Sequence, residues 1–192
     1  LERSGKLDNT LIIISSDNGP WFLGDAGNLR GRKGNTFEGG MRVPFIAHWP
    51  AMIPAGRTEH AMAMGIDLLP TVLDLLQLPQ PLDRNLDGRS LLPVLTGGGP
   101  SPHDYLYYYD GEILFAVRDA RFKYRAAAGV LYGTDQLPVG ITMPMKEWLF
   151  DLAADPREAY DTSERNPDDL ARLRAAFAAK TREMADNARG WQ

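Results

Sequence analysis

The chain has 192 residues, of which 21 are lysine or arginine and 25 are aspartate or glutamate, so its formal net charge is −4. This mildly acidic balance excludes a nucleic-acid binder that depends on bulk positive charge. The sequence contains no cysteine, which excludes disulfides, thiolate metal ligands and thiol nucleophiles from these residues. Its apolar runs are far shorter than the roughly 20 residues that a membrane helix needs, so no membrane partner is expected.

The first part of the chain alternates between strand-like and loop-like character. Residues 11–14 are four consecutive large apolar side chains, and a run without alternation is typical of a strand covered on both faces of a parallel sheet. A second buried strand is predicted at 43–49. Between them, residues 16–41 contain seven glycines, and a loop of this length inside a compact domain usually serves a function.

Residues 68–76 predict a short apolar helix with Asp67 as its N-cap. The segment that follows is rich in proline, glycine and aspartate. It ends in a Gly-Gly-Gly-Pro run at residues 97–100, which marks a boundary. We therefore predict that residues 1–99 belong to an α/β domain and that residues 100–192 form a small α+β domain.

The small domain is predicted to be an antiparallel sheet with one long helix. Short aromatic and β-branched runs indicate consecutive strands, at residues 105–109, 113–118, 122–126 and 148–150. A helix is predicted to begin after the N-cap Asn166, with Pro167 in its first position. Largely apolar residues then recur at spacings of three and four, as on a helix face that covers a sheet. They are Leu170, Leu173, Phe177, Thr181, Met184 and Ala188.

Asp17 and Asn18 directly follow the first predicted strand. In open α/β sheets, ligands bind beyond the carboxyl ends of the strands. A carboxylate beside a carboxamide offers hard oxygen ligands, which suit calcium or magnesium better than zinc. Since such ions take about six or more ligands, others must come from elsewhere in the fold. The alternative is an Asn-Gly turn in which both side chains bond to nearby backbone.

Lys33 lies in a basic part of the same loop. Arg30, Arg32 and Lys33 fall within four residues, and the flanking glycines let the backbone approach a ligand closely. A lysine ammonium is a suitable partner for a tetrahedral oxyanion such as sulfate or phosphate. The alternative is a solvated basic loop. Taken with Asp17 and Asn18, the pattern predicts an anion held by a bound metal ion and Lys33.

Several motifs occur in order along the chain. They are Ser16-Asp17-Asn18-Gly19, Gly31-Arg32-Lys33-Gly34, Glu38-Gly39-Gly40-Met41-Arg42-Val43-Pro44, His48-Trp49-Pro50, Asp67-Leu68-Leu69-Pro70-Thr71, and Leu149-Phe150-Asp151-Leu152 with Asp155-Pro156. Together they resemble the second half of a type I sulfatase of the arylsulfatase kind. The likeness extends over nearly the whole chain, so it is more specific than any single motif.

The resemblance implies an alkaline-phosphatase-like α/β/α sandwich, to which residues 1–99 contribute the C-terminal part. It also implies hydrolysis of small-molecule sulfate esters at a calcium site, with magnesium the lesser expectation. By their positions in the motifs, Asp17 and Asn18 match two of the family's calcium ligands. Lys33 matches the catalytic lysine that contacts the sulfate group. The family's nucleophile is a hydrated formylglycine made in a Cys/Ser-x-Pro-Ser-Arg motif, which these residues do not contain.

The missing motif predicts that this chain is the C-terminal portion of a longer enzyme, with the formylglycine upstream. Alone it is expected to have no turnover, and to self-associate or bind its missing N-terminal half, because apolar strands would otherwise be exposed. Two other hypotheses stay open. One is a phosphonate monoester or phosphodiester hydrolase of the same superfamily, and the other is a non-catalytic assembly or binding module. Periplasmic, secreted and cytoplasmic locations are all compatible with the sequence.

A few further residues carry structural expectations. His48, in an apolar strand, is expected to be packed, whereas His60 and His103, in polar segments, are expected to face solvent. Glu38 is expected to fix the backbone beside the glycines. The tyrosines at 105 and 107–109 have two interpretations: they pack between sheet and helix, or one or two of them line the rim of a substrate pocket.

Overall fold

The computed structural model describes residues 1–127 and 146–186 and divides the chain into two compact units. Unit 1 consists of Leu1–Asp17 and Val43–Asp104, and unit 2 of Asn18–Arg42 and Tyr105–Gln192. The glycine-rich loop therefore belongs to the same unit as the C-terminal part of the chain. The division into domains at residue 99 stays a prediction.

Unit 1 contains a two-stranded sheet and short helices. β1 (Ile12–Ser15) pairs antiparallel with β2 (Phe45–His48), with Ile12 opposite His48 and Ser15 opposite Phe45. The helical elements are the 3-10 turns η1 (Glu2–Ser4) and η2 (Gly65–Asp67), and the helices α2 (Leu68–Leu75) and α3 (Leu92–Gly97). The predicted apolar helix is thus present as α2.

The prediction that β1 is covered on both faces as in a parallel sheet, and that β2 is a second buried strand, is wrong for this pair. The strands are antiparallel, and Ile14 and Ile46 are 59% and 57% exposed. An unbroken apolar run indicates that both faces of a strand are apolar, but it supplies neither the neighbouring strand's direction nor the layers that cover those faces. The described residues leave these side chains largely uncovered.

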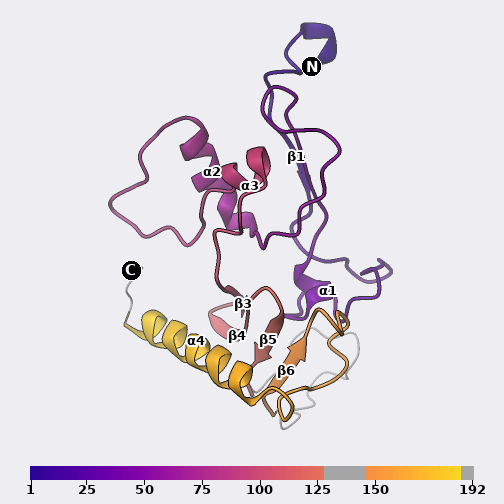
Figure 1. Ribbon diagram of the computed structural model, residues 1–192, viewed down its shortest axis with the longest axis vertical. Coiled ribbons are helices and arrows are strands. Elements are labelled where there is room, and N and C mark those ends of the chain that lie inside the picture. The colour runs from indigo at the N-terminus through magenta and orange to yellow at the C-terminus, as the bar shows by residue number, and fades with distance from the viewer. Residues whose placement is uncertain (128–145, 187–192) are drawn as a thin grey trace. The chain divides into compact units, whose positions relative to one another are not determined.

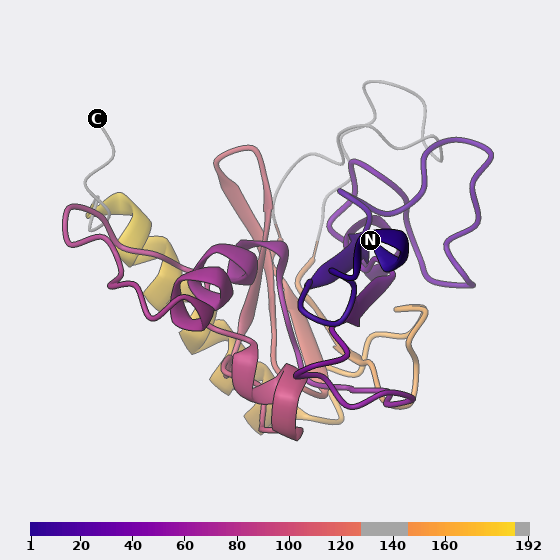
Figure 2. The same cartoon turned by 90° about the horizontal axis from the view of Figure 1, so that it is seen from above.

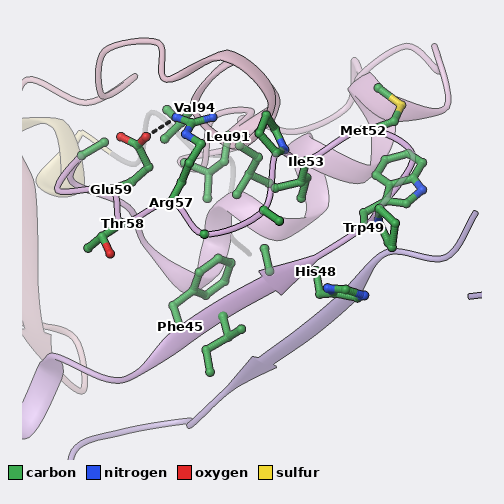
Figure 3. Close-up of a pocket in the computed structure, with 18 of the residues that line it drawn as sticks. Phe45, His48, Trp49, Met52, Ile53, Arg57, Thr58, Glu59, Leu91 and Val94 are labelled. Carbon is green, nitrogen blue, oxygen red and sulfur yellow. Dashed lines mark hydrogen bonds and ion pairs between the residues drawn. The ribbon is translucent and has the colours of Figure 1, made fainter. Parts of the chain in front are cut away.

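Unit 1 also has an open cavity of about 950 Å³ beside β2. Phe45 of β2, Leu91 at the N-cap of α3 and Val94 of α3 lie on its mainly apolar walls (Figure 3). An ion pair between Arg57 and Glu59 lies on the same wall.

Unit 2 is built on a four-stranded antiparallel sheet in the order β3-β4-β5-β6. The strands are β3 (Leu106–Asp110), β4 (Ile113–Arg118), β5 (Phe122–Arg125) and β6 (Trp148–Asp151). The one-turn helix α1 (Glu38–Met41) closes the glycine-rich loop, and α4 (Pro167–Ala185) is the longest helix in the part of the chain that the structure describes. Figures 1 and 2 show α4, in yellow, running along one face of the sheet. The antiparallel sheet and the long helix predicted from the sequence are confirmed.

The core of unit 2 lies between α4 and the sheet. Leu173 of α4 is fully buried among Val117, Phe122, Tyr124 and Leu149. Burial of one such leucine stabilises the fold by about 1.5–3 kcal/mol. Other residues of the predicted helix face, Leu170 and Phe177, also pack against this core. Ala188, the last residue of that face, lies outside the described residues.

The two faces of the sheet carry different chemistry, because successive residues of a strand point to opposite sides. On β5, Phe122 and Tyr124 face α4, whereas Lys123 and Arg125 face the glycine-rich loop. The tyrosines of β3 follow the same rule: Tyr107 packs against the core, and the hydroxyl of buried Tyr108 donates to Glu38. The interpretation that the tyrosines pack between sheet and helix therefore accounts for Tyr107, whereas Tyr108 lies on the opposite face of the sheet.

Burial is expected to raise the pH at which three tyrosine hydroxyls lose their protons. It raises the pKa of Tyr109 and Tyr124 to about 12, and that of Tyr108 well above its ordinary value. In the unfolded chain a tyrosine ionises near pH 10, so the unfolded state releases its protons first. The free energy of unfolding should therefore fall as pH rises from about 10 to 12.

An alkaline titration followed by near-ultraviolet tyrosinate absorbance, beside urea unfolding at each pH, checks this expectation. Tyr124→Phe is the control variant, because it should remove part of the absorbance that develops near pH 12. Tyrosinate absorbance in the folded chain that develops in a single transition with its midpoint near pH 10 would contradict the burial of these hydroxyls.

Candidate functional site

The predicted metal ligands Asp17 and Asn18 are joined by one peptide bond at a change of unit. Asp17 follows β1, is exposed and ends the first segment of unit 1. Asn18 is half-buried and begins the glycine-rich loop of unit 2. The loop conformation around Asn18 therefore decides which other groups come close to it.

Backbone hydrogen bonds fold the loop back on itself and bring the segment after Asn18 beside Lys33. The amide of Lys33 donates to the carbonyl of Pro20 at 3.0 Å, and the amide of Gly19 donates to the carbonyl of Gly40 at 2.9 Å. Asn18 and half-buried Lys33 are thus carried by neighbouring stretches of one loop in unit 2.

Glycines make this close backbone approach possible. A Cβ added to Gly19 would collide with the carbonyl of Gly39, and one added to Gly40 would collide with the carbonyl of Asn35. Gly31 and Gly34 have φ values of 83° and 89°, a left-handed conformation that favours glycine. The seven glycines counted in the sequence therefore include positions where any side chain would push the loop apart.

The chemistry of these donors fits part of a calcium or magnesium site. Asp17 and Asn18 offer a carboxylate and a carboxamide oxygen, the ligands that both ions prefer. Within residues 1–127 and 146–186, no group of three or more His, Cys, Asp or Glu is arranged to hold a metal ion. These two residues would thus supply only part of the metal's coordination sphere. Lys33 adds a cation suited to binding an oxyanion.

A buried cluster of charged side chains that the sequence does not predict lies beneath the loop. The Glu38 carboxylate accepts hydrogen bonds from Tyr108 Oη at 2.7 Å, Arg118 Nη1 at 2.9 Å and Lys123 Nζ at 3.1 Å. Lys123 Nζ lies 2.8 Å from Glu158 Oε1, and both side chains have no exposed surface. One sequence signal is the alternation Phe-Lys-Tyr-Arg at 122–125, because cations on a covered strand face need acidic partners.

The carboxylates of this cluster respond differently to burial. Burial alone would raise the pKa of Glu38, but Lys123 and Arg118 outweigh it and hold that pKa below its ordinary value. Burial raises the pKa of Glu158, although Lys123 opposes the shift. Glu38 has two cationic partners, Lys123 and Arg118, whereas Glu158 is paired with Lys123. The expectation that Glu38 only fixes backbone beside the glycines understates its role.

Comparisons with known proteins now identify the family. Residues 1–78 match the family model described as Sulfatase. Human arylsulfatase A is 37% identical over 174 residues, which cover 82% of this chain and 34% of that protein. The chain belongs to the sulfatase family. It spans about a third of the length of the curated relatives it matches.

Solved sulfatase structures share the fold. The structure of the PsFucS1 sulfatase from Pseudoalteromonas sp. matches with a TM-score of 0.82 and 27% identity, over 96% of this chain and 39% of that one. A phosphonate monoester hydrolase of Agrobacterium radiobacter matches with a TM-score of 0.62 and 26% identity, over 97% and 37% of the two chains. The predicted fold class, a mixed α/β protein of alkaline-phosphatase-like fold, is confirmed.

Two of the three histidines of this sulfatase chain do not lie where the sequence predicts, whereas His60 is exposed as expected. His48 is exposed rather than packed, and His103 is buried rather than solvent-facing. His103 Nε2 lies 2.8 Å from Asp67 Oδ1, and Asp67 also accepts the backbone amide of Arg89 at 2.9 Å. Asp67 occupies the N-cap position of α2 but makes no side-chain cap bond there. The reason is that its carboxylate already accepts from the preceding Met64 amide, at 2.7 Å, and from two partners distant in sequence.

No helix among the described residues is long and apolar enough to cross a membrane.

Proposed function

We propose that the protein to which this chain belongs hydrolyses sulfate esters with calcium, and that this chain supplies two metal ligands and the sulfate-binding lysine. Asp17 and Asn18 are the ligands, and Lys33 is the catalytic residue that contacts the sulfate group. One observation carries the proposal: the amide of Lys33 donates to the carbonyl of Pro20 at 3.0 Å. Because Pro20 comes two residues after Asn18, this bond holds the backbone of Lys33 beside the segment that follows Asn18. Membership of the sulfatase family supports the sulfate ester as substrate.

Each residue would have a distinct task. Calcium, when bound, would supply positive charge next to the sulfate oxygens. Asp17 and Asn18 would hold that ion through oxygen donors. The Lys33 ammonium would orient the sulfate group and offset the negative charge that grows on its oxygens as the ester bond breaks. None of these side chains is an activated nucleophile. We therefore propose that the attacking group, a formylglycine, lies outside these 192 residues.

The test uses the protein expressed from its complete coding sequence. With a nitrophenyl sulfate, we expect nitrophenol release that chelation of metal by EDTA abolishes, and that calcium restores better than magnesium. The isolated 192-residue chain is the control, and it should release no nitrophenol above buffer. Full activity in EDTA would discard the metal role of Asp17 and Asn18. Turnover by the isolated chain would discard the external nucleophile.

A second candidate is hydrolysis of phosphonate monoesters, and one observation favours it: the match to the phosphonate monoester hydrolase of Agrobacterium radiobacter. Sulfate and phosphonate esters both present tetrahedral anions to a lysine and a metal ion. Paired nitrophenyl sulfate and nitrophenyl phosphonate substrates decide between them. A higher kcat/KM for the sulfate ester is expected, and a higher value for the phosphonate would replace our proposal with this candidate.

A further inference from the structure

The ion cluster beneath the loop connects the glycine-rich loop to the sheet at several backbone points. Lys123 Nζ donates to the carbonyl of Thr36 at 2.8 Å as well as to Glu38. The amide of Glu38 donates to Glu158 Oε2 at 2.6 Å, and Arg30 Nη1 donates to the backbone carbonyl of Glu158 at 2.8 Å. Residues 30, 36 and 38 of the loop are therefore bonded to side chains or backbone from the C-terminal part of unit 2.

Aromatic contacts also attach the glycine-rich loop to the sheet. The Phe37 ring, 3% exposed, lies under the guanidinium groups of Arg30, at 4.1 Å, and Arg125, at 4.7 Å. Phe37 also contacts Trp148 and Phe150 of β6, with ring centroids 6.4 Å apart in both pairs. The side chain between Thr36 and Glu38 is thus packed against the sheet, so the loop cannot slide while the ion cluster stays bonded.

From these attachment points, short backbone steps lead to the proposed site. The carbonyl of Arg30 accepts the amide of Gly39 at 2.7 Å, and the next residue, Gly40, accepts the amide of Gly19. Asn18 directly precedes Gly19, and Lys33 is bonded to Pro20. A shift of Glu38 would therefore displace the stretches that carry both Asn18 and Lys33.

A buried ionic cluster is an unusual way to hold a loop if stability is all that it provides. Well-packed apolar side chains often stabilise a protein as much as a buried ion pair, because desolvation offsets the Coulomb attraction. Hydrogen bonds between charged groups differ from apolar contacts because they are directional, and so they hold a group at one position. If the group moves away, a buried charge is left without a partner. This property suits a loop whose groups must be placed accurately for catalysis.

We propose that Glu38, Lys123 and Glu158 are positioning residues, a buried clamp that places the loop bearing Asn18 and Lys33 for the sulfatase reaction. The inference rests on the proposed function for its catalytic consequence, but the placement of the loop can be measured separately. None of the three residues is proposed to touch the substrate.

The test compares Lys123→Met with Lys180→Met in the protein from the complete coding sequence. Lys180 is the matched control, because it is also a buried lysine of unit 2, paired with Glu183 at 3.0 Å on α4. In Lys123→Met, hydrogen exchange at the amides of Gly19, Lys33 and Gly39 should accelerate at least about tenfold while the β4 amides keep their protection. The kcat on an aryl sulfate should fall about 10- to 100-fold. Lys180→Met should leave the loop amides and kcat nearly unchanged.

Equal acceleration of loop and β4 amides, or equal effects of the two variants on the loop, would overturn the clamp. If Lys123→Met does not fold, Glu158→Gln decides, because it keeps an acceptor for the Glu38 amide and removes only the charge that pairs with Lys123. It should accelerate exchange at the same loop amides, and unchanged exchange would reject the proposal. A protein without sulfatase activity in any variant would reject the proposed function, while the exchange data would still decide on the clamp.

Discussion

Lys33→Ala should lower kcat of the complete protein on an aryl sulfate by about 10²–10³-fold, the usual effect of removing one preorganised group that stabilises developing charge. The half-buried Lys33 is held beside Pro20 through its backbone amide. Truncation of its side chain should therefore remove the cation without unfolding the loop. Steady-state kinetics on a nitrophenyl sulfate, with unfolding measured in parallel, checks both parts of the expectation.

Arg32→Ala is the matched control for Lys33, because it removes a neighbouring cation from the same loop. We expect its effect on kcat to be much smaller, because the Arg32 guanidinium lies over the ring of Phe22, 5.8 Å from its centroid. Equal losses in the two variants would mean that the loop attracts the substrate through overall charge. Lys33 would then have no specific contact with the sulfate group.

Asp67→Ala should lower the free energy of unfolding of unit 1 by about 3 kcal/mol or more, because each buried donor left without an acceptor costs about 1–3 kcal/mol. Asp67 has no exposed surface, and its carboxylate accepts the amides of Met64 at 2.7 Å and Arg89 at 2.9 Å. It also lies 2.8 Å from His103 Nε2. Alanine would leave these donors buried without a partner. Urea unfolding of the chain measures the loss.

Two variants bracket that result. Asp67→Asn keeps an oxygen acceptor of nearly the same shape and should lose less stability than Asp67→Ala. Asp74→Ala, on the exposed side of the same helix, removes a carboxylate that accepts from the Ser90 hydroxyl at 2.5 Å and should cost at most about 1 kcal/mol. If Asp67→Ala and Asp74→Ala were equally mild, the buried network around Asp67 would not hold unit 1 together.

The sequence predicts local elements well in unit 2. The strands β3 to β6 follow runs of aromatic and β-branched residues, and α4 begins at Pro167 as its helix-start signals indicate. These features depend on neighbouring residues and on a regular period, so short stretches of sequence contain the necessary information. In unit 1 the same reasoning locates β1 and β2 but predicts the wrong burial for both and a parallel sheet for β1, because burial and strand direction depend on elements outside the strand.

The chemistry of the candidate site can also be predicted from the types of its residues. A carboxylate, a carboxamide and an ammonium within one glycine-rich loop indicate an oxyanion beside a hard metal ion, whatever the surrounding fold. The roles of Asp17, Asn18 and Lys33 stay predictions. The folded loop contributes the observation that Lys33 is bonded to Pro20, and so lies across from the residue after Asn18.

The sequence by itself determined the family motifs, the antiparallel sheet with its long helix, and the candidate ligands, since each depends on local pattern or on a side chain's own chemistry. Only the tertiary structure decided the antiparallel pairing of β1 with β2 and the partners of the buried acids. Asp67 meets His103 across 36 residues of sequence, and the Glu38 amide meets Glu158 across 120. Polar and charged groups, once buried, must find partners wherever the fold brings them, and no local pattern encodes that choice.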